Sequence, residues 1–187
     1  MIKKLIKLAN ELDKRGLKKE ADTLDGIVKG AAKKKKKKAL YTAYTAAFLT
    51  DTSRKELYNW WKSHLETDTL DRVPAHSHMT IKSKPSAEEV LSLPIGEEEG
   101  SIKLTVVGYA KNDLGQAVHV SGLESSNDHA HITISVSKDA PGGFAYSNDL
   151  LGTGITPVNK GPVLDARIGF HNGREVRYNF EGSIYEE

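Results

Sequence analysis

The sequence contains no cysteine among its 187 residues. This absence excludes disulfide bonds, thiolate zinc sites and a cysteine nucleophile, and it suits a reducing compartment. Long apolar runs are also missing, since no stretch approaches the roughly 20 residues that a helix needs to span a bilayer. The basic N-terminus is not followed by a continuous apolar segment, so it does not resemble a signal peptide. We therefore expect a cytoplasmic protein with no membrane partner.

Net charge is small for the whole chain but unevenly distributed. Residues 1–38 hold fourteen Lys and Arg and five Asp and Glu, which gives them a net charge of +9. Because the whole chain has a net charge of +2, residues 39–187 carry −7. Phosphate contacts dominate the affinity for long nucleic acids, and domains that bind them are usually basic. Residues 39–187 are therefore not expected to bind along a long RNA or DNA backbone. Binding of a small anionic ligand remains compatible with this charge.

Composition divides the chain into three parts. Residues 1–29 place apolar residues at helical spacing on either side of Gly16, which predicts a helical hairpin as a leader. Residues 30–38 contain six consecutive lysines, which repel one another and predict a solvated linker, with an accessory phosphate-binding arm as the alternative. Residues 39–187 are long enough to form one domain with its own core.

Strand-like and helix-like segments alternate in residues 39–187 and predict a mixed α+β domain. Asp51, Thr52 or Ser53 can cap the first helix, and the turn-forming segments KNDLG and HNGR predict two hairpins. The expected strands cover residues 40–49, 76–81, 101–110, 116–123, 131–137, 163–170 and 175–184, and the expected helices cover residues 53–66 and 86–93.

One six-residue pattern occurs twice, as HSHMTI at residues 76–81 and as HAHITI at residues 129–134. Four of the seven histidines lie in these two copies. Side chains alternate between the two faces of a strand, so each copy places two histidines and a threonine on one face and two apolar residues on the other. The polar faces hold His76, His78 and Thr80 in the first copy, and His129, His131 and Thr133 in the second.

Two such strands facing each other would line a cleft suited to phosphate chemistry without a metal. One neutral imidazole would accept a proton from the attacking oxygen, and the other, protonated, would donate to the leaving oxygen. Histidine allows both states near neutrality because its ordinary pKa is about 6.5. The threonine hydroxyls would donate hydrogen bonds to non-bridging phosphate oxygens.

The tetrapeptides His78-Met79-Thr80-Ile81 and His131-Ile132-Thr133-Ile134 resemble the two His-x-Thr/Ser-hydrophobic signatures of the 2H phosphoesterase superfamily. The resemblance covers about residues 40–187. It implies a bilobal α+β fold, with two antiparallel sheets around a central cleft, and a phosphodiesterase that needs no cofactor. It also implies that the catalytic residues are His78, Thr80, His131 and Thr133.

Segments 122–136 and 145–150 look most like tRNA-ligase-type cyclic phosphodiesterases and like phage enzymes that destroy the cyclic oligonucleotide signals of CBASS immunity. The leader is similar to those of phage-encoded proteins, which implies action in a host cytoplasm. A cyclic di- or trinucleotide is therefore the expected substrate. RNA ends bearing a 2′,3′-cyclic phosphate are the alternative, and an inactive nucleotide-binding module is a third reading. No obligate protein partner is indicated.

Several other residues have a functional and a plain structural interpretation. Tyr44 and Tyr109 are candidates for stacking on a nucleobase, with core packing as the alternative. The two His-x-His pairs could chelate a metal, but Asp128 is the only adjoining carboxylate, so no metal is expected. Packing or surface positions are expected for His64, His119 and His171. Core packing is expected for Trp60 and Trp61, with base stacking as the alternative, and a turn is expected at Ser147-Asn148, with a ligand contact as the alternative. No chemistry is assigned to His76 or His129.

Because both motifs lie beyond residue 38, residues 1–38 are predicted to be dispensable for catalysis. A chain that begins at Ala39 should keep its turnover number on a small phosphodiester, measured by chromatography of the products. Circular dichroism of the shortened chain serves as the control for folding. A folded but inactive truncation would contradict the linker interpretation.

Overall fold

The computed structural model describes residues 16–19, 42–95 and 100–179. The chain divides into two compact units, residues 1–39 with 182–187, and residues 40–181. The second, called the main unit here, contains both histidine motifs. The hairpin and the lysine-rich linker expected near the N-terminus lie outside the described residues, apart from residues 16–19. Among the described residues, no helix combines the length and the apolar character that a membrane crossing requires.

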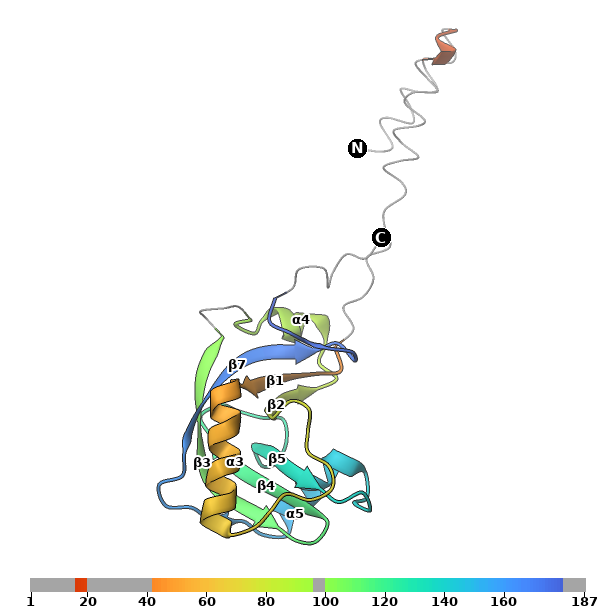
Figure 1. The fold of residues 1–187 in the computed structure, drawn as a ribbon. Coiled ribbons are helices and arrows are strands. Elements are labelled where there is room, and N and C mark those ends of the chain that lie inside the picture. The colour runs from red at the N-terminus through yellow and green to blue at the C-terminus, as the bar shows by residue number, and fades with distance from the viewer. Residues whose placement is uncertain (1–15, 20–41, 96–99, 180–187) are drawn as a thin grey trace. The chain divides into compact units, whose positions relative to one another are not determined.

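The main unit is built mostly of antiparallel strands (Figure 1). Its elements, in chain order, are β1 (Tyr44–Leu49), α3 (Asp51–Leu65), β2 (His78–Ser83), α4 (Ala87–Leu91), β3 (Ser101–Lys111), β4 (Gly115–Ser121), β5 (His131–Val136), the 3₁₀ turn η1 (Gly143–Ala145), α5 (Tyr146–Gly152), β6 (Thr156–Pro157), β7 (Val163–His171) and β8 (Val176–Arg177). The strands and the two helices expected from the sequence are confirmed to within a few residues at their ends, except that β8 is only two residues long.

The strands close into a six-stranded antiparallel barrel in the order β3-β4-β5-β2-β1-β7, with β7 returning to β3. The long strand β3 makes this closure possible. Its first half pairs with β7, where Ser101 lies opposite Arg167, and its second half pairs with β4, where Lys111 lies opposite Gln116. At the other side of the ring, β2 and β5 pair at one position, Met79 opposite Ile132.

The expected bilobal α+β fold, with two sheets around a cleft, is therefore wrong for the main unit, whereas the N-terminal helical hairpin expected with it lies outside the described residues. The strands that would have formed two separate sheets form one closed ring with few helices, because β3 belongs to both halves and β2 meets β5. Closure depends on pairings between strands as distant as residues 102 and 166. Local periodicity determines which segments are strands, but it does not determine which partners they choose.

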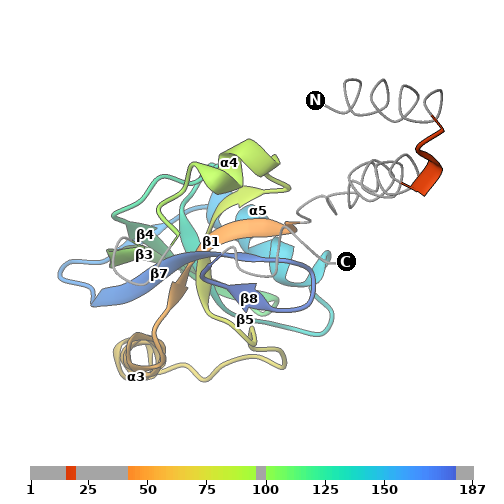
Figure 2. The same ribbon diagram turned by 90° about the horizontal axis from the view of Figure 1, so that it is seen from above.

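The interior of the barrel is the hydrophobic core. Met79 and Ile132 of the two motifs point into it and are fully buried, and Leu57 and Trp61 of α3 join them. Helix α3 runs beside the barrel, where Figure 2 shows it end-on. Helix α5 packs against the outer side of β4, where Leu150 and Leu151 contact residues such as Ala117. The motif side chains that do not point into the core therefore lie on the outer face of the barrel.

Local signals in the sequence explain where the helices begin. The side chain of Thr50 accepts a hydrogen bond from the Ser53 backbone at 3.2 Å and caps α3, one residue before the expected caps. Helix α4 begins with a reciprocal capping box, in which Ser86 and Glu89 each accept a bond from the other's backbone. The chain leaves α3 through Glu66, whose φ of 47° ends the helix.

The adjacent tryptophans of α3 allow a matched test of the core. Trp61 is 1% exposed within the core, whereas Trp60 is half-buried and stacks on the exposed His64. We predict that Trp61→Ala lowers the free energy of unfolding by about 3–5 kcal/mol, the usual cost of emptying a large aromatic site. Trp60→Ala should lower the free energy of unfolding by roughly half of that amount or less, because folding removes less apolar area of Trp60 than of Trp61 from water. Urea denaturation measures both, and equal losses would contradict this account of the core.

Candidate active site

The two motifs lie side by side on the adjacent strands β2 and β5. Since Met79 is opposite Ile132 in an antiparallel pair, the next positions along the strands bring His78 near Thr133 and Thr80 near His131. Each histidine is thus beside the threonine of the other motif. All four side chains point outward, because their neighbours Met79 and Ile132 point into the core.

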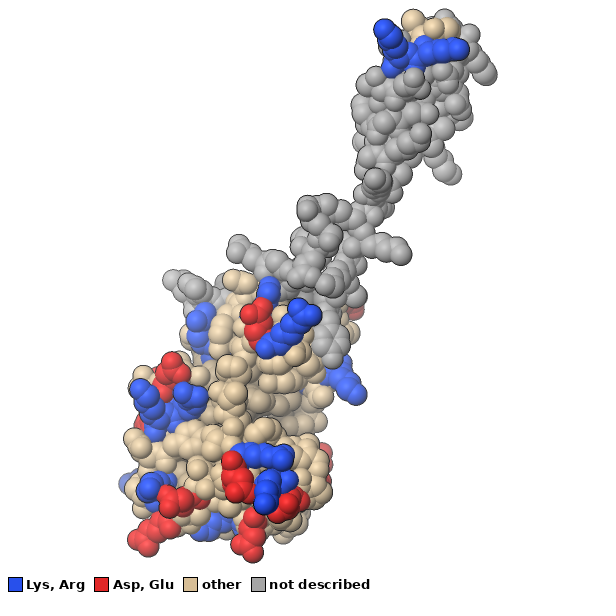
Figure 3. All heavy atoms as spheres, turned by 45° about the vertical axis from the view of Figure 1, so that its right-hand side comes forward, with Lys and Arg blue, Asp and Glu red and all other residues tan. Residues whose placement is uncertain are grey.

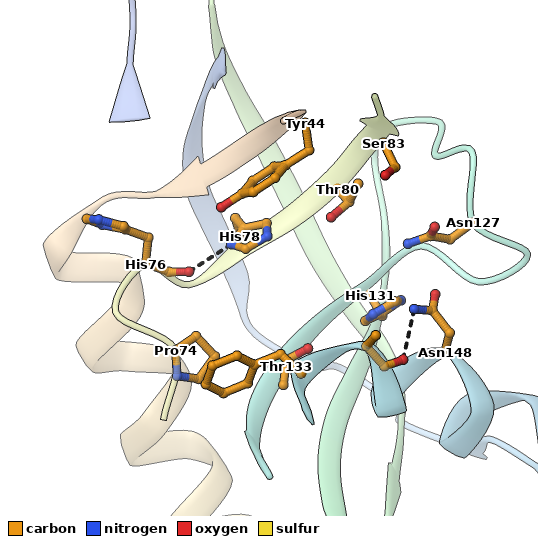
Figure 4. A pocket seen from close by; sticks show the side chains of 12 residues that line it. Tyr44, Pro74, His76, His78, Thr80, Ser83, Asn127, His131, Thr133 and Asn148 are labelled. Carbon is orange, nitrogen blue, oxygen red and sulfur yellow. Dashed lines mark hydrogen bonds between the residues drawn. The ribbon is translucent and has the colours of Figure 1, made fainter. Parts of the chain in front are cut away.

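These four side chains line one cavity of about 410 Å³ on the outer face of the barrel (Figure 4). A cavity of that size is in the range of small-molecule sites. Strands β1, β2 and β5 form its floor, and the loops around Pro74, Asn127 and Phe144 form its walls. Among the described residues that line it there is no lysine, arginine or carboxylate. The candidate catalytic groups therefore lie in an environment without a lysine, arginine or carboxylate side chain.

Both imidazoles are oriented by the same backbone contact. The Nδ1 atom of His78 lies 2.8 Å from the backbone oxygen of His76 (Figure 4). In the same way, Nδ1 of His131 lies 2.8 Å from the backbone oxygen of His129. A carbonyl oxygen can only accept, so each Nδ1 carries its hydrogen and donates. In the neutral ring Nε2 is then the acceptor, and it is the atom available to take or give a proton in the cavity.

Burial lowers the pKa of both histidines from its ordinary value. Desolvation is the main cause for His78, and nearby His131 lowers the pKa further, while the bond to the His76 carbonyl partly opposes this shift. Desolvation is likewise the main cause for His131, with a further lowering by His119 and His129. Because burial lowers both pKa values from the ordinary histidine value, it favours the neutral form of both rings near pH 7.

The structure brings Tyr44 into the cavity but gives it a contact that the sequence did not indicate. Its ring stacks on His78 with centroids 4.9 Å apart, and on His171 with centroids 5.2 Å apart. The two imidazoles come from β2 and β7, the strands on either side of β1. A nucleobase would have to displace one of them to stack on Tyr44. Its contacts are those of a side chain that holds the His78 ring in place.

Tyr109, the other candidate for base stacking, is not in this cavity. Its ring lies edge-on against Trp61 at 6.0 Å and packs on the hydrophobic core. The structure therefore gives Tyr109 a packing contact and separates it from the four motif residues.

Residues of α5 and of the β4–β5 loop complete the site and were not assigned a role from the sequence. The Thr133 hydroxyl donates to the fully buried Ser147 hydroxyl at 2.9 Å, which fixes Thr133 against α5. Ser125 donates to the Thr80 carbonyl at 2.6 Å and places Asn127 at the cavity rim. Asn148, on α5, lines the same cavity.

A signal for these residues exists in the sequence. The tripeptide Ser-Asn-Asp occurs at residues 126–128, in the β4–β5 loop, and again at residues 147–149. Both asparagines line the cavity (Figure 4). The turn expected at Ser147-Asn148 is wrong, because both residues belong to α5. The ligand contact considered for them as the alternative stays a prediction.

Three further histidines lie close to the four motif residues. His119 and His129 lie edge to face at 5.8 Å beside His131, and His76 lies at the cavity edge. In the part of the chain that the structure describes, no three His, Asp or Glu side chains are grouped as metal ligands. His64 lies on α3 against Trp60, outside the cavity lining.

The chain matches no protein-family model, and no curated protein matches its sequence.

The carbonyl contacts predict a specific tautomer for both histidines. In protein labelled with ¹⁵N-histidine, the resonances of His78 and His131, assigned by single substitutions, should show a protonated Nδ1 and an unprotonated Nε2 at pH 7.5. Their titration midpoints should lie below the ordinary histidine pKa of about 6.5, because burial opposes the charged form. A protonated Nε2 in either ring would contradict this geometry.

Proposed function

We propose that the main unit is a phosphodiesterase that uses His78 and His131 as its acid–base pair. One observation carries the proposal: two imidazoles, each with Nδ1 bound to a backbone carbonyl, present Nε2 to one cavity and face a threonine from the other motif. The resemblance of the two His-x-Thr segments to the 2H phosphoesterases supports the same reaction, although the closed barrel differs from the bilobal fold that the resemblance implied.

The proposed reaction needs one histidine in each protonation state. Neutral Nε2 of one ring takes a proton from the attacking water or hydroxyl as its oxygen forms a bond to phosphorus. The protonated Nε2 of the other ring gives its proton to the leaving oxygen as the old P–O bond breaks. The Thr80 hydroxyl donates to one non-bridging oxygen. The Thr133 hydroxyl donates to another after its hydrogen turns from Ser147 to the substrate, and the Ser147 hydroxyl can then donate to the Thr133 oxygen.

The substrate itself supplies the charge that the cavity lacks. Both histidines have a lowered pKa, which suits the general base but not the general acid. A phosphodiester anion beside the rings favours the imidazolium form and raises the pKa of the nearer one. Binding of the substrate and protonation of the acid are then coupled, and turnover should follow a bell-shaped dependence on pH.

A cyclic di- or trinucleotide is the substrate that fits these features best. The net charge of −7 on residues 39–187 gives little long-range attraction for polyanionic RNA. Figure 3 shows positive and negative side chains interspersed on the face of the main unit that it presents, without a broad basic surface there. A small cyclic nucleotide carries few phosphates and can be held by local donors such as Asn127.

Substitution of the paired residues tests the proposed chemistry. His78→Ala and His131→Ala should each lower kcat by about 10²–10⁴, the usual contribution of a general acid or base. Thr80→Ala and Thr133→Ala should lower it by roughly 10–100-fold, because each removes one hydrogen bond to a charged oxygen. His64→Ala, on α3 outside the cavity, is the matched control and should keep full activity.

The assay uses chelator-treated protein with a panel of cyclic di- and trinucleotides and an RNA that ends in a 2′,3′-cyclic phosphate, with products separated by chromatography. Activity that is lost to the chelator and restored by zinc or manganese would refute the proposed mechanism. Opening of the RNA end alone, with every cyclic oligonucleotide intact, would replace the proposed substrate by RNA ends.

A further inference from the structure

The outer face of the barrel continues beyond the catalytic cavity to an arginine. Phe48 of β1 lies opposite His78 on β2 and opposite Arg167 on β7, so these three residues form one row across three strands. Neighbouring strands are about 4.8 Å apart, which places the backbones of His78 and Arg167 about 10 Å from each other. The two residues are on the same face of the sheet because both are directly opposite Phe48.

A second cavity of about 310 Å³ lies beside this arginine. His76 lines both this cavity and the catalytic one, so the two are neighbours. Arg54 of α3 and Tyr178 line the second cavity with Arg167. The two cavities differ in charge. Two arginines line the second cavity, whereas the described residues that line the catalytic cavity include no lysine or arginine.

The guanidinium of Arg167 is oriented but not neutralised by a described carboxylate. Its central carbon lies 4.6 Å from the centre of the Tyr178 ring, and its buried Nε has no hydrogen-bond partner among the described residues. Arg54 donates to the Ala75 carbonyl at 3.3 Å and lies 3.7 Å from Asp51, whose side chain is 90% exposed. Asp51 is the only carboxylate in the described lining of this cavity.

We propose that this second cavity is an anion subsite that binds a second phosphate of the same substrate molecule, with Arg167 as the main contact and Arg54 as the second. The proposal rests on the phosphodiesterase function proposed for the neighbouring cavity. Guanidinium groups present paired N–H donors that match phosphate oxygens, and stacking on Tyr178 holds this fork in one orientation.

The subsite would define the substrate class. With one phosphate between His78 and His131, a substrate needs a second phosphate on the same side to reach Arg167. A cyclic dinucleotide or trinucleotide has this second phosphate. A 2′,3′-cyclic mononucleotide has only one phosphate and can occupy the catalytic cavity alone. Binding energy from Arg167 would therefore favour substrates with at least two phosphates.

Calorimetric binding to a chain carrying His131→Ala, which removes one proposed acid–base group, tests the subsite without turnover. The probes are cyclic di-adenosine monophosphate and 2′,3′-cyclic adenosine monophosphate. Adding Arg167→Gln should weaken binding of the cyclic dinucleotide by about 10-fold or more, the usual effect of losing a charged hydrogen-bond pair, and leave the mononucleotide unchanged. Arg54→Gln should act in the same direction with a smaller effect.

Arg174→Gln, in the exposed β7–β8 turn, removes the same charge outside this cavity and should change neither affinity. Thermal unfolding of each variant shows whether Arg167 is needed only for folding, and Arg54→Gln keeps the test valid if Arg167→Gln unfolds. Equal losses for both probes, no loss for either, or no binding of the dinucleotide would overturn the subsite. If the chain without substitutions shows no turnover of the cyclic dinucleotide, the proposed function is refuted. The subsite remains supported in that case if binding of the cyclic dinucleotide still depends on Arg167.

Discussion

On the side of the barrel where β2 meets β5, a single backbone pairing, Met79 opposite Ile132, joins the two strands and brings the two histidine motifs together. Both side chains are fully buried, and each contributes about 1.5–3 kcal/mol through removal from water. That burial also fixes the register, since a slip of one residue on either strand would turn its histidine and threonine into the core. The apolar half of each motif thus determines where the polar half lies.

The hold of β5 on β2 is reinforced by the loop that precedes β5. Ser126 donates its backbone N–H to the Ile81 carbonyl at 2.7 Å, and Ser125 donates its hydroxyl to the Thr80 carbonyl at 2.6 Å. These bonds satisfy backbone groups of β2 that a longer strand pairing would otherwise satisfy. The loop that supplies them also places Asn127 at the cavity, so stability of this edge and shape of the site depend on the same residues.

Much of the site could be predicted from the sequence, and much of the fold could not. The alternation of side chains in HSHMTI and HAHITI placed His78, Thr80, His131 and Thr133 on polar faces with apolar backs, as the structure shows. The closed barrel could not be predicted because the pairing of β3 with β7 joins residues as far apart as Ser101 and Arg167, and no local pattern in the sequence indicates it. For the same reason the stacking of Tyr44 on His171 and the packing of Tyr109 on Trp61 could not be foreseen.

The contacts that orient the two imidazoles use main-chain oxygens, and this has an evolutionary consequence. The partners of His78 and His131 are the carbonyl groups of residues 76 and 129, which every amino acid possesses. The side chains at those two positions can therefore drift without disturbing the orientation of the rings, as long as the strand begins in the same conformation. The conformation that must be kept is the one that places each of these carbonyl groups beside the imidazole two residues further along the chain. The histidine side chains at positions 76 and 129 are not needed for that contact.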